Sequence, residues 1–207
     1  MMTMRERIAT GKLFTDYCEG LPEDRQQAKR RMIAFNATGP DDLAARSRLR
    51  NEIFGRETNA WIEPPFYFCY GTNIEIGDSC YINFNCNFVD DGKIILGSKV
   101  MFGPAVTIAT VGHPLNPHYR AYMYTDPVRI ADNCWIGAGS IICPGVTISE
   151  NRVIGAGSVA TKDIAGNSVT VSHPCRVLRT TEEHDMQYSY QDRARTVDDP
   201  AEEAGWR

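Results

Sequence analysis

The 207-residue sequence predicts a mainly β fold, a parallel β-helix with a small N-terminal helical cap and a protruding loop. An apolar residue recurs at every sixth position, apart from a two-residue shift at Asp90-Asp91 and one longer gap. These positions are Ile76, Ile82, Phe88, Leu96, Phe102, Ile108, Ile130, Ile136, Ile142, Ile148 and Ile154. The segment Ile-Gly-Ala-Gly-Ser at 136–140 recurs unchanged at 154–158. This larger repeat indicates a solenoid with coils of eighteen residues, or three hexads.

Each hexad is expected to supply a short strand whose leading aliphatic side chain points into the coil. A six-residue period does not match the helical period of about 3.6 residues. The β-branched and glycine content also opposes helix formation. Glycine often follows the apolar position, as at Gly77, Gly97, Gly103, Gly137 and Gly155. We expect these glycines to let the backbone bend at the turns.

The first part of the chain, residues 1–60, has a helical pattern and is predicted to form the cap. The predicted helices span 5–10, 23–34 and 41–54. Pro22 and Pro40 each precede acidic residues, which is typical of a helix start.

The rest of the chain divides into a connector, a coil region and a tail. The segment 61–68 holds two prolines and several aromatic residues, and we expect an extended connector there. The β-helix is predicted over 61–180, with a loop at 112–128 where three prolines break the rhythm. The tail 181–207 is highly polar and is expected to be partly disordered.

Composition excludes several function classes. A net charge of −4 and a pI near 5.6 give no general attraction to nucleic acid or to an anionic membrane. The charged N-terminus does not resemble a secretory signal, and no apolar run reaches transmembrane length, so we expect a cytoplasmic protein. The seven cysteines are scattered without a C-x-x-C pair, so we expect reduced and mostly buried thiols.

Nine short motifs follow one another along the chain. They are Gly11–Asp16, Glu19–Pro22, Asn59–Pro65, Asn83–Asn85, Val89–Asp91, Gly112–Pro114, Asn133–Gly137, Val159–Ile164 and Pro174–Val177. Their order and spacing resemble those of the hexapeptide-repeat acyltransferases, and within them the galactoside and maltose O-acetyltransferases. The resemblance covers nearly the whole chain. It implies a left-handed β-helix and a homotrimer with active sites between subunits. It also implies direct transfer of an acetyl group from acetyl-CoA to a hydroxyl of a sugar or glycoside.

Acetyl transfer needs a base for the hydroxyl proton and donors for the oxyanion. The resemblance assigns the base to His113, one of four histidines, and a neutral imidazole can accept a proton near physiological pH. It implies that Asn83 takes part in catalysis and that the backbone N–H of Ala138 stabilises the oxyanion. Without the resemblance, His113 is also compatible with a structural loop histidine next to Pro114, and Ala138 with an ordinary turn residue.

The resemblance also assigns the acceptor site. It places Asp16 of the cap, on the acceptor side, with residues of the coil and the loop. The implied acceptor-binding residues are Asp16, Tyr81, Asn83, Asp91 and Met123. Carboxylates and amides suit sugar hydroxyls because they accept or donate several hydrogen bonds at fixed angles. On residue type alone, Asp16 also fits a helix cap and Tyr81 fits packing on the coil.

Coenzyme A carries several phosphate charges, which need a local basic cluster in an otherwise acidic protein. The residues that the resemblance assigns to coenzyme A are Trp135, Ala138, Thr161, Lys162, Arg176 and Arg179. Composition alone favours a solvated basic face for the cations. One departure from the family pattern is Val171-Ser172-His173, where relatives have a small glycine-containing turn.

Three other functions compete with this interpretation. The spacing of His113 and His118 also occurs in zinc-dependent carbonic anhydrases with a similar coil. Catalytic zinc needs three protein ligands, and no histidine precedes His113, so we expect no metal. A non-catalytic trimeric scaffold is the second alternative. An acetyltransferase for serine or an antibiotic is the third.

Overall fold

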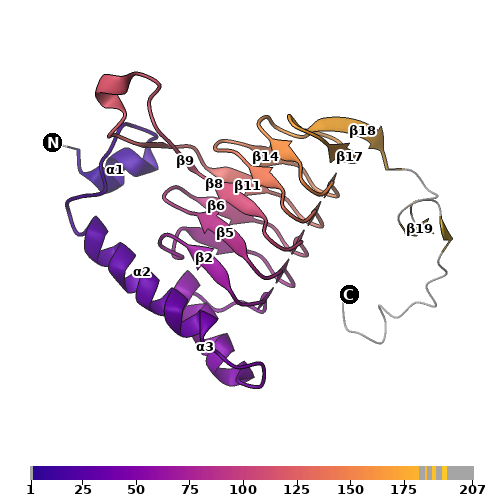
Figure 1. Ribbon diagram of the computed structural model, residues 1–207, viewed down its shortest axis with the longest axis horizontal. Coiled ribbons are helices and arrows are strands. Elements are labelled where there is room, and N and C mark those ends of the chain that lie inside the picture. The colour runs from indigo at the N-terminus through magenta and orange to yellow at the C-terminus, as the bar shows by residue number, and fades with distance from the viewer. Residues whose placement is uncertain (1, 182–184, 186–187, 190–192, 195–207) are drawn as a thin grey trace.

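The computed structural model describes residues 2–181, 185, 188–189 and 193–194. The predicted disorder of the tail 181–207 falls mostly on residues outside this described part. Three helices come first and are followed by a stack of short strands (Figure 1). The helices are α1 (Met4–Ala9), α2 (Leu21–Asn36) and α3 (Leu43–Phe54), close to the predicted segments.

The strands form three sheets that the chain visits in turn, so each coil is triangular. The seven-stranded sheet holds β1 (Trp61–Ile62), β4 (Tyr81–Ile82), β7 (Met101–Phe102), β12 (Trp135–Ile136), β15 (Val153–Ile154), β17 (Ser168–Val171) and β18 (Arg176–Thr180). The five-stranded sheet holds β2 (Phe66–Phe68), β5 (Cys86–Val89), β8 (Thr107–Ala109), β13 (Ile141–Ile142) and β16 (Val159–Ala160). The four-stranded sheet holds β3 (Ile74–Ile76), β6 (Ile94–Leu96), β11 (Val128–Ile130) and β14 (Thr147–Ile148).

Two short strand pairs lie outside these sheets. β9 (Val111–Gly112) and β10 (Tyr124–Thr125) form an antiparallel ribbon at the base of the protruding loop. A short 3-10 helix, η1 (Pro117–Tyr119), lies within that loop. β19 (Tyr188–Ser189) pairs with β20 (Arg193–Ala194) near the C-terminus. In the three sheets, the pairing of β17 with β18 is antiparallel, and the other described pairs are parallel.

The length of a coil changes along the chain. Trp61 pairs with Tyr81, and Tyr81 with Met101, which gives coils of twenty residues before the loop. The predicted eighteen-residue coil holds after the loop, where Trp135 pairs with Val153. The segment 61–68 is extended and pairs with the next coil, because β1 and β2 pair with β4 and β5 and form the first coil.

Side chains at the repeat positions stack into columns inside the coils. In the seven-stranded sheet, Ile62, Ile82, Phe102, Ile136 and Ile154 follow one another in register, and none is more than 3% exposed. Full burial of such a side chain stabilises the fold by about 1.5–3 kcal/mol. The six-residue period therefore marks the core, and the predicted parallel β-helix is confirmed.

The five repeat glycines have a different role from the predicted one, since none of them has a positive φ. A Cβ built on Gly77 would lie 2.6 Å from the carbonyl carbon of Gly97 in the next coil. The left-handed turn residues come two positions later, for example Ser79 and Lys99, both with φ of 57°. Glycine is needed after the apolar position because successive coils approach closely there.

The helical cap closes the N-terminal end of the β-helix (Figure 1). Phe35 of α2 and Ile53 and Phe54 of α3 belong to the same buried apolar cluster as the first coils. The Asn36 side chain bonds to both backbone groups of Phe66, its Nδ2 donating to the carbonyl at 3.0 Å and its Oδ1 accepting from the amide at 2.8 Å. Asn36 thereby satisfies β2 at the open edge of its sheet, as a neighbouring strand would.

Asp90 fixes the wider turn of the twenty-residue coils. Its buried carboxylate accepts hydrogen bonds of 2.7–2.9 Å from the amides of Cys69, Tyr70 and Gly71. Burial raises the pKa of Asp90 to about 7, although the three N–H groups act in the opposite direction. Because this pKa lies above that of an unfolded aspartate, the stability linked to it is fully present below about pH 4 and is lost as the pH rises through about 7.

We expect Asp90→Ala to lower the free energy of unfolding by about 2–4 kcal/mol, because three N–H groups, two of them buried, lose their acceptor. Urea denaturation of both proteins measures the difference. The difference in free energy of unfolding between the two proteins should become smaller as the pH rises from about 5 to about 8, because the raised pKa of Asp90 makes the parent less stable over this range. Asp78→Ala, at an exposed turn, is the control and should change stability by less than about 0.5 kcal/mol. An Asp90→Ala variant as stable as the parent would contradict the assignment.

Candidate active site

The protruding loop marks one edge of the β-helix, where the five-stranded sheet turns into the four-stranded sheet. We call this the loop edge and define it by residues 69–73, 90–93, 110–127, 143–146 and 161–163. The ribbon of β9 and β10 carries the loop away from the coils (Figure 1). The predicted loop at 112–128 is therefore present, and its base belongs to a strand pair.

His113 directly follows β9 at the base of this loop. Its Nδ1 lies 2.8 Å from the carbonyl oxygen of Arg120 and 3.1 Å from that of Tyr122. Because a carbonyl oxygen can only accept a hydrogen bond, these contacts assign the proton of the neutral ring to Nδ1. Nε2 then keeps its lone pair. The side chain is exposed, so this nitrogen is open to a ligand.

The N-terminal segment reaches the same place. Phe14 and Met123 exchange two backbone hydrogen bonds of 2.9 Å, and the Thr125 hydroxyl donates to the Ile8 carbonyl at 2.8 Å. These contacts bring the predicted residues Asp16 and Met123 to the loop edge. The structure also gives Asp16 a partner that the sequence did not predict, because its buried carboxylate forms an ion pair with Arg25 of α2.

Asp91 is the second buried carboxylate of the loop edge, at 5% exposure. Burial raises its pKa, while a hydrogen bond from the Cys69 thiol and the nearby charges of Arg25 and His113 act in the opposite direction. Asp91 thus interacts with both the cap and the loop histidine. The predicted residues Asp16, Asp91, His113 and Met123 all lie at this edge.

Sequence reasoning missed two residues of this site, Arg25 and Cys69. Burial raises the pKa of the Cys69 thiol, and the neighbouring Asp91 adds to the shift, so this thiol stays protonated and can donate a hydrogen bond. A twenty-residue coil, visible in the spacing from Phe68 to Phe88, would have placed Cys69 beside the Val89-Asp90-Asp91 turn. Nothing in the sequence distinguishes Arg25 as a site residue. Five other basic or amide side chains follow it in α2 between positions 26 and 31.

The other predicted catalytic residues lie on a different edge, where the seven-stranded sheet turns into the five-stranded sheet. We call it the Asn83 edge and define it by residues 83–85, 103–106, 137–140 and 155–158. Ala138 lies on it, and its N–H donates to no acceptor within the described residues. Tyr81 and Trp135 lie close by, on the outer face of the seven-stranded sheet on either side of Met101.

One chain does not bring these two groups together. β5, four residues long, separates Asn83 from Asp91, and at about 3.3 Å per residue it spans roughly 13 Å. The edges are therefore too far apart for His113 and Asn83 of one chain to contact the same small hydroxyl.

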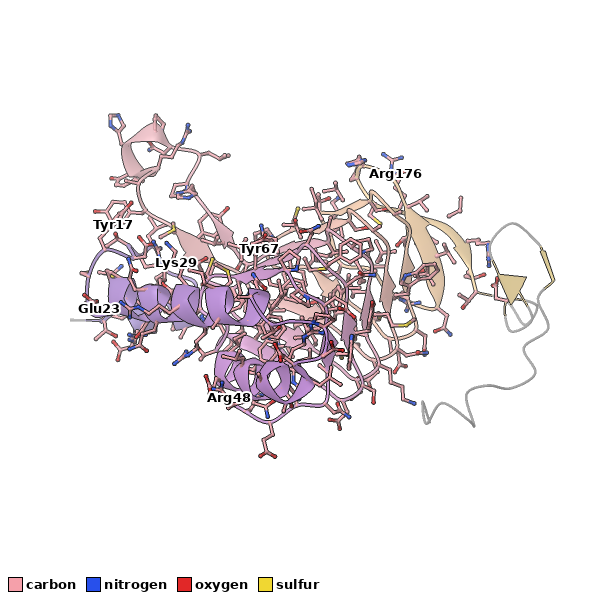
Figure 2. The ribbon with its side chains drawn as sticks, turned by 60° about the horizontal axis from the view of Figure 1, so that its bottom comes forward. Tyr17, Glu23, Lys29, Arg48, Tyr67 and Arg176 are labelled. Atoms are coloured by element: carbon pink, nitrogen blue, oxygen red, sulfur yellow. The ribbon has the colours of Figure 1, made fainter. Side chains whose placement is uncertain are left out.

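The residues assigned to coenzyme A lie toward the C-terminal end, far from the cap. Figure 2 shows Arg176 at the opposite end from Tyr17 and Glu23. Thr161 and Lys162 follow β16, and the segment leading to Arg176 runs beside that strand, since the amide of Cys175 donates to the Val159 carbonyl at 2.8 Å. The four residues assigned to coenzyme A at this end are all exposed, namely Thr161, Lys162, Arg176 and Arg179. Arg179 differs from the others, because its guanidinium contacts both carboxylate oxygens of Asp185 at 2.5 and 2.6 Å.

Two negative findings concern the described residues. No group of three or more His, Cys, Asp or Glu side chains there could hold a metal ion. No helix in that part is long and apolar enough to cross a membrane.

Coils of six-residue repeats with a histidine at the base of a looped-out segment define the class of hexapeptide-repeat transferases. A family model described as the hexapeptide repeat of succinyl-transferase matches residues 127–162, and one described as the maltose acetyltransferase hexapeptide capping motif matches residues 7–57. The chain is 47% identical to galactoside O-acetyltransferase of Escherichia coli strain K12 over 194 aligned residues. The alignment covers 92% of this chain and 96% of the relative. The chain therefore belongs to the galactoside and maltose O-acetyltransferase family of acyltransferases.

Solved structures agree with this placement. A galactoside acetyltransferase in complex with coenzyme A superimposes with a TM-score of 0.90 at 45% identity, covering 95% of this chain and 100% of that chain. A maltose O-acetyltransferase from Clostridium difficile 630 gives a TM-score of 0.85 at 40% identity, covering 88% and 99%. The fold is the left-handed parallel β-helix of these acetyltransferases, as the resemblance implied.

Proposed function

We propose that this protein transfers an acetyl group from acetyl-CoA directly to a hydroxyl of a sugar or glycoside, with His113 as the general base. The observation that carries the proposal is the double contact of His113 Nδ1 with two loop carbonyls, which leaves Nε2 free to accept a proton. The relatives named above act on galactoside and maltose, and one of them binds coenzyme A. We keep the cytoplasmic location as part of this proposal.

In the proposed reaction, the acceptor hydroxyl gives its proton to Nε2 of His113 as its oxygen attacks the thioester carbon. The negative charge that develops on the carbonyl oxygen is stabilised by the N–H of Ala138, which has no acceptor within the described residues. The carbon–sulfur bond then breaks, and the proton moves from the imidazolium to the sulfur of coenzyme A. The two loop carbonyls hold the ring in one orientation throughout.

For the acceptor we propose the buried carboxylates Asp16 and Asp91, with Met123 against the sugar ring and Tyr81 and Asn83 completing the site. Both carboxylates already have a partner, Arg25 or Cys69, which fixes their orientation before the sugar binds. A hydroxyl can donate to the remaining lone pairs of each carboxylate. This preorganisation lowers the entropy that binding would otherwise cost.

We propose that the protein works as a homotrimer, with each site shared by the loop edge of one subunit and the Asn83 edge of the next. The separation of the two edges within one chain supports this assembly. The outer face of the seven-stranded sheet supports it too, because Trp61, Met101 and Trp135 lie in register and are 46%, 41% and 50% exposed. Phe84, on the Asn83 edge, is 48% exposed. An apolar surface of this kind is typical of a subunit interface.

The proposed function is tested by measuring free thiol released from acetyl-CoA in the presence of single acceptors. The panel contains a galactoside, maltose, glucose, serine and a hydroxylated antibiotic. Release that depends on a sugar supports the proposal. Release with serine or the antibiotic alone would favour the alternative acceptors, and no release above hydrolysis with any of them would favour the scaffold.

On the donor side, we expect Lys162→Ala to raise KM for acetyl-CoA about 3- to 10-fold with little change in kcat, since a remote phosphate contact acts equally in the ground and transition states. Arg176→Ala should behave in the same way. Arg179→Ala should have a smaller effect, because Asp185 already engages its guanidinium. Steady-state kinetics with varied acetyl-CoA measures these values. The control is Lys29→Ala, which is exposed on the distant cap. Equal KM values in all variants would show that the basic cluster does not bind acetyl-CoA.

A further inference from the structure

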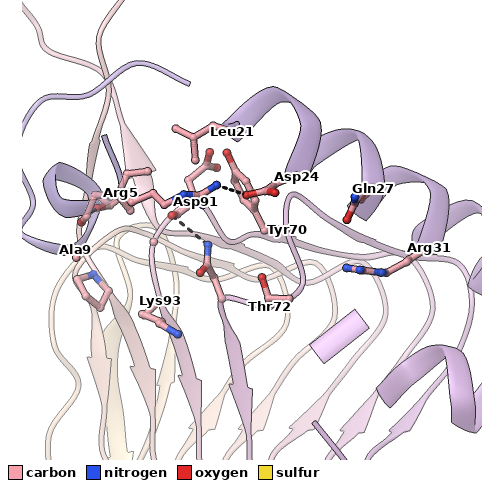
Figure 3. Close-up of a pocket in the computed structure, with 15 residues that line it drawn as sticks. Arg5, Ala9, Leu21, Asp24, Gln27, Arg31, Tyr70, Thr72, Asp91 and Lys93 are labelled. Carbon is pink, nitrogen blue, oxygen red and sulfur yellow. Dashed lines mark hydrogen bonds and ion pairs between the residues drawn. The ribbon is translucent and has the colours of Figure 1, made fainter. Parts of the chain in front are cut away.

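A pocket of about 540 Å³ lies between the cap and the loop edge, apart from His113. α1 and α2 form one wall, and the turns that contain Tyr70, Thr72 and Lys93 form the other (Figure 3). Volumes of this size are typical of small-molecule sites. The proposed acetyl transfer uses none of the side chains that open into it except Asp91.

Four polar side chains that line this pocket have no hydrogen bond or ion pair within the described residues. They are Arg31 and Gln27 of α2, and Tyr70 and Thr72 of the coil. Figure 3 shows Arg31 and Gln27 extending from the helix toward the coil side. Tyr70 carries the strongest signal, because its residue is 6% exposed and its hydroxyl is buried without a partner. A buried hydroxyl left unpaired costs about 1–3 kcal/mol, which a ligand acceptor would recover.

The charges around the pocket leave one cation uncompensated. Arg5 and Asp24 form an ion pair of 2.5 Å at its rim, and the carboxylate of Asp91 interacts with Cys69 and Arg25. Arg31 has no carboxylate partner among the described residues.

Lys93 can supply a second positive charge. It pairs with Glu75 at 3.1 Å, but its side chain is 47% exposed and that of Glu75 37%. Exposed pairs of this kind contribute only about 0–1 kcal/mol, so Lys93 can exchange Glu75 for a ligand at small cost.

The rest of the wall is apolar. Ile8 and Ala9 of α1, Leu21 of α2 and Pro127 after the loop line the pocket. Such a surface suits the carbon skeleton of a ligand better than a bare inorganic ion.

We propose that this pocket is a second binding site, next to the acetyl-transfer site and sharing only Asp91 with it, for a small metabolite with one oxyanion group on a hydroxylated carbon skeleton. Arg31 binds the oxyanion, with Lys93 as the second cation. Tyr70 donates its hydroxyl hydrogen to the ligand, and Thr72 and Gln27 bind its hydroxyl groups. The oxyanion is a phosphate monoester or a carboxylate, which share this recognition chemistry.

The test is isothermal titration calorimetry on the full chain with coenzyme A in excess, so that the donor phosphates do not compete. Glycerol 3-phosphate and glycerate are the two anionic probes, and glycerol is the uncharged control. We expect saturable binding of at least one anion and none of glycerol. Binding of one anion alone identifies the phosphate or the carboxylate as the group recognised.

Variants locate the site. Arg31→Gln should weaken the anion about tenfold or more, whereas Arg30→Gln, exposed on the same helix outside the pocket, should leave Kd unchanged. Tyr70→Phe should weaken it severalfold, with circular dichroism showing a folded protein. The proposal is overturned if neither anion binds to the parent protein, or if Arg30→Gln weakens binding as much as Arg31→Gln. Since the readout is binding rather than turnover, this result is independent of the proposed acetyl transfer.

Discussion

Replacing His113 by alanine is expected to lower kcat for acetyl transfer by about 10²–10⁴-fold, the usual effect of losing a general base. The imidazole is exposed at the base of the loop, so its removal leaves no cavity in the core. The proposed trimer and the KM for acetyl-CoA should therefore change little. The measurement is thiol release at saturating acetyl-CoA and acceptor, with size-exclusion chromatography of both proteins.

His118 offers a matched control for this variant. It lies in η1 of the same loop, it is exposed, and its side chain makes no hydrogen bond within the described residues. We expect His118→Ala to retain nearly full activity. A loss of similar size in both variants would indicate that the loop matters as a whole. Near-normal turnover by His113→Ala would show that His113 is not the general base.

The apolar positions could be predicted because each of these side chains has one requirement, which is burial inside the coil. Ile82 and Ile136 keep the six-residue rhythm, because a slip of one residue would turn the aliphatic side chain outward. The length of the first coils was missed, although the spacing from Phe68 to Phe88 contains it. It depends on the turn where Asp90 satisfies three amides, and a carboxylate in a sequence does not show which amides it will cap.

The site was predicted unevenly for a related reason. The family motifs named His113, Asp16 and Asp91, and the structure places all three at the loop edge. Arg25 and Cys69 join them only through tertiary contacts, so no local pattern marks them. The resemblance gave both groups of site residues and implied sites between subunits, but it did not show which residues share an edge of one chain, because a motif list carries no distances.

Co-expression of two inactive variants, His113→Ala and Asn83→Ala, is expected to restore activity. If each site takes His113 from one subunit and Asn83 from the next, a mixed trimer contains sites in which both residues are intact. Each mixed trimer, whether it holds two chains of one variant or of the other, has one site of its three with both residues intact, so about a third of the sites recover once mixed trimers are isolated. Because each variant alone is expected to lose about 10²-fold or more, this recovery is a large signal.

The control is co-expression of His113→Ala with the double variant His113→Ala/Asn83→Ala, in which no site can regain the histidine. Both mixtures carry different purification tags on their two chains, so that mixed trimers are isolated before thiol release is measured. Recovery in the first mixture and not in the second supports a site between subunits, as the roughly 13 Å of β5 between the two edges requires. If the first mixture stays as inactive as its separate components, the two residues serve the same chain or different tasks, and the shared site is wrong.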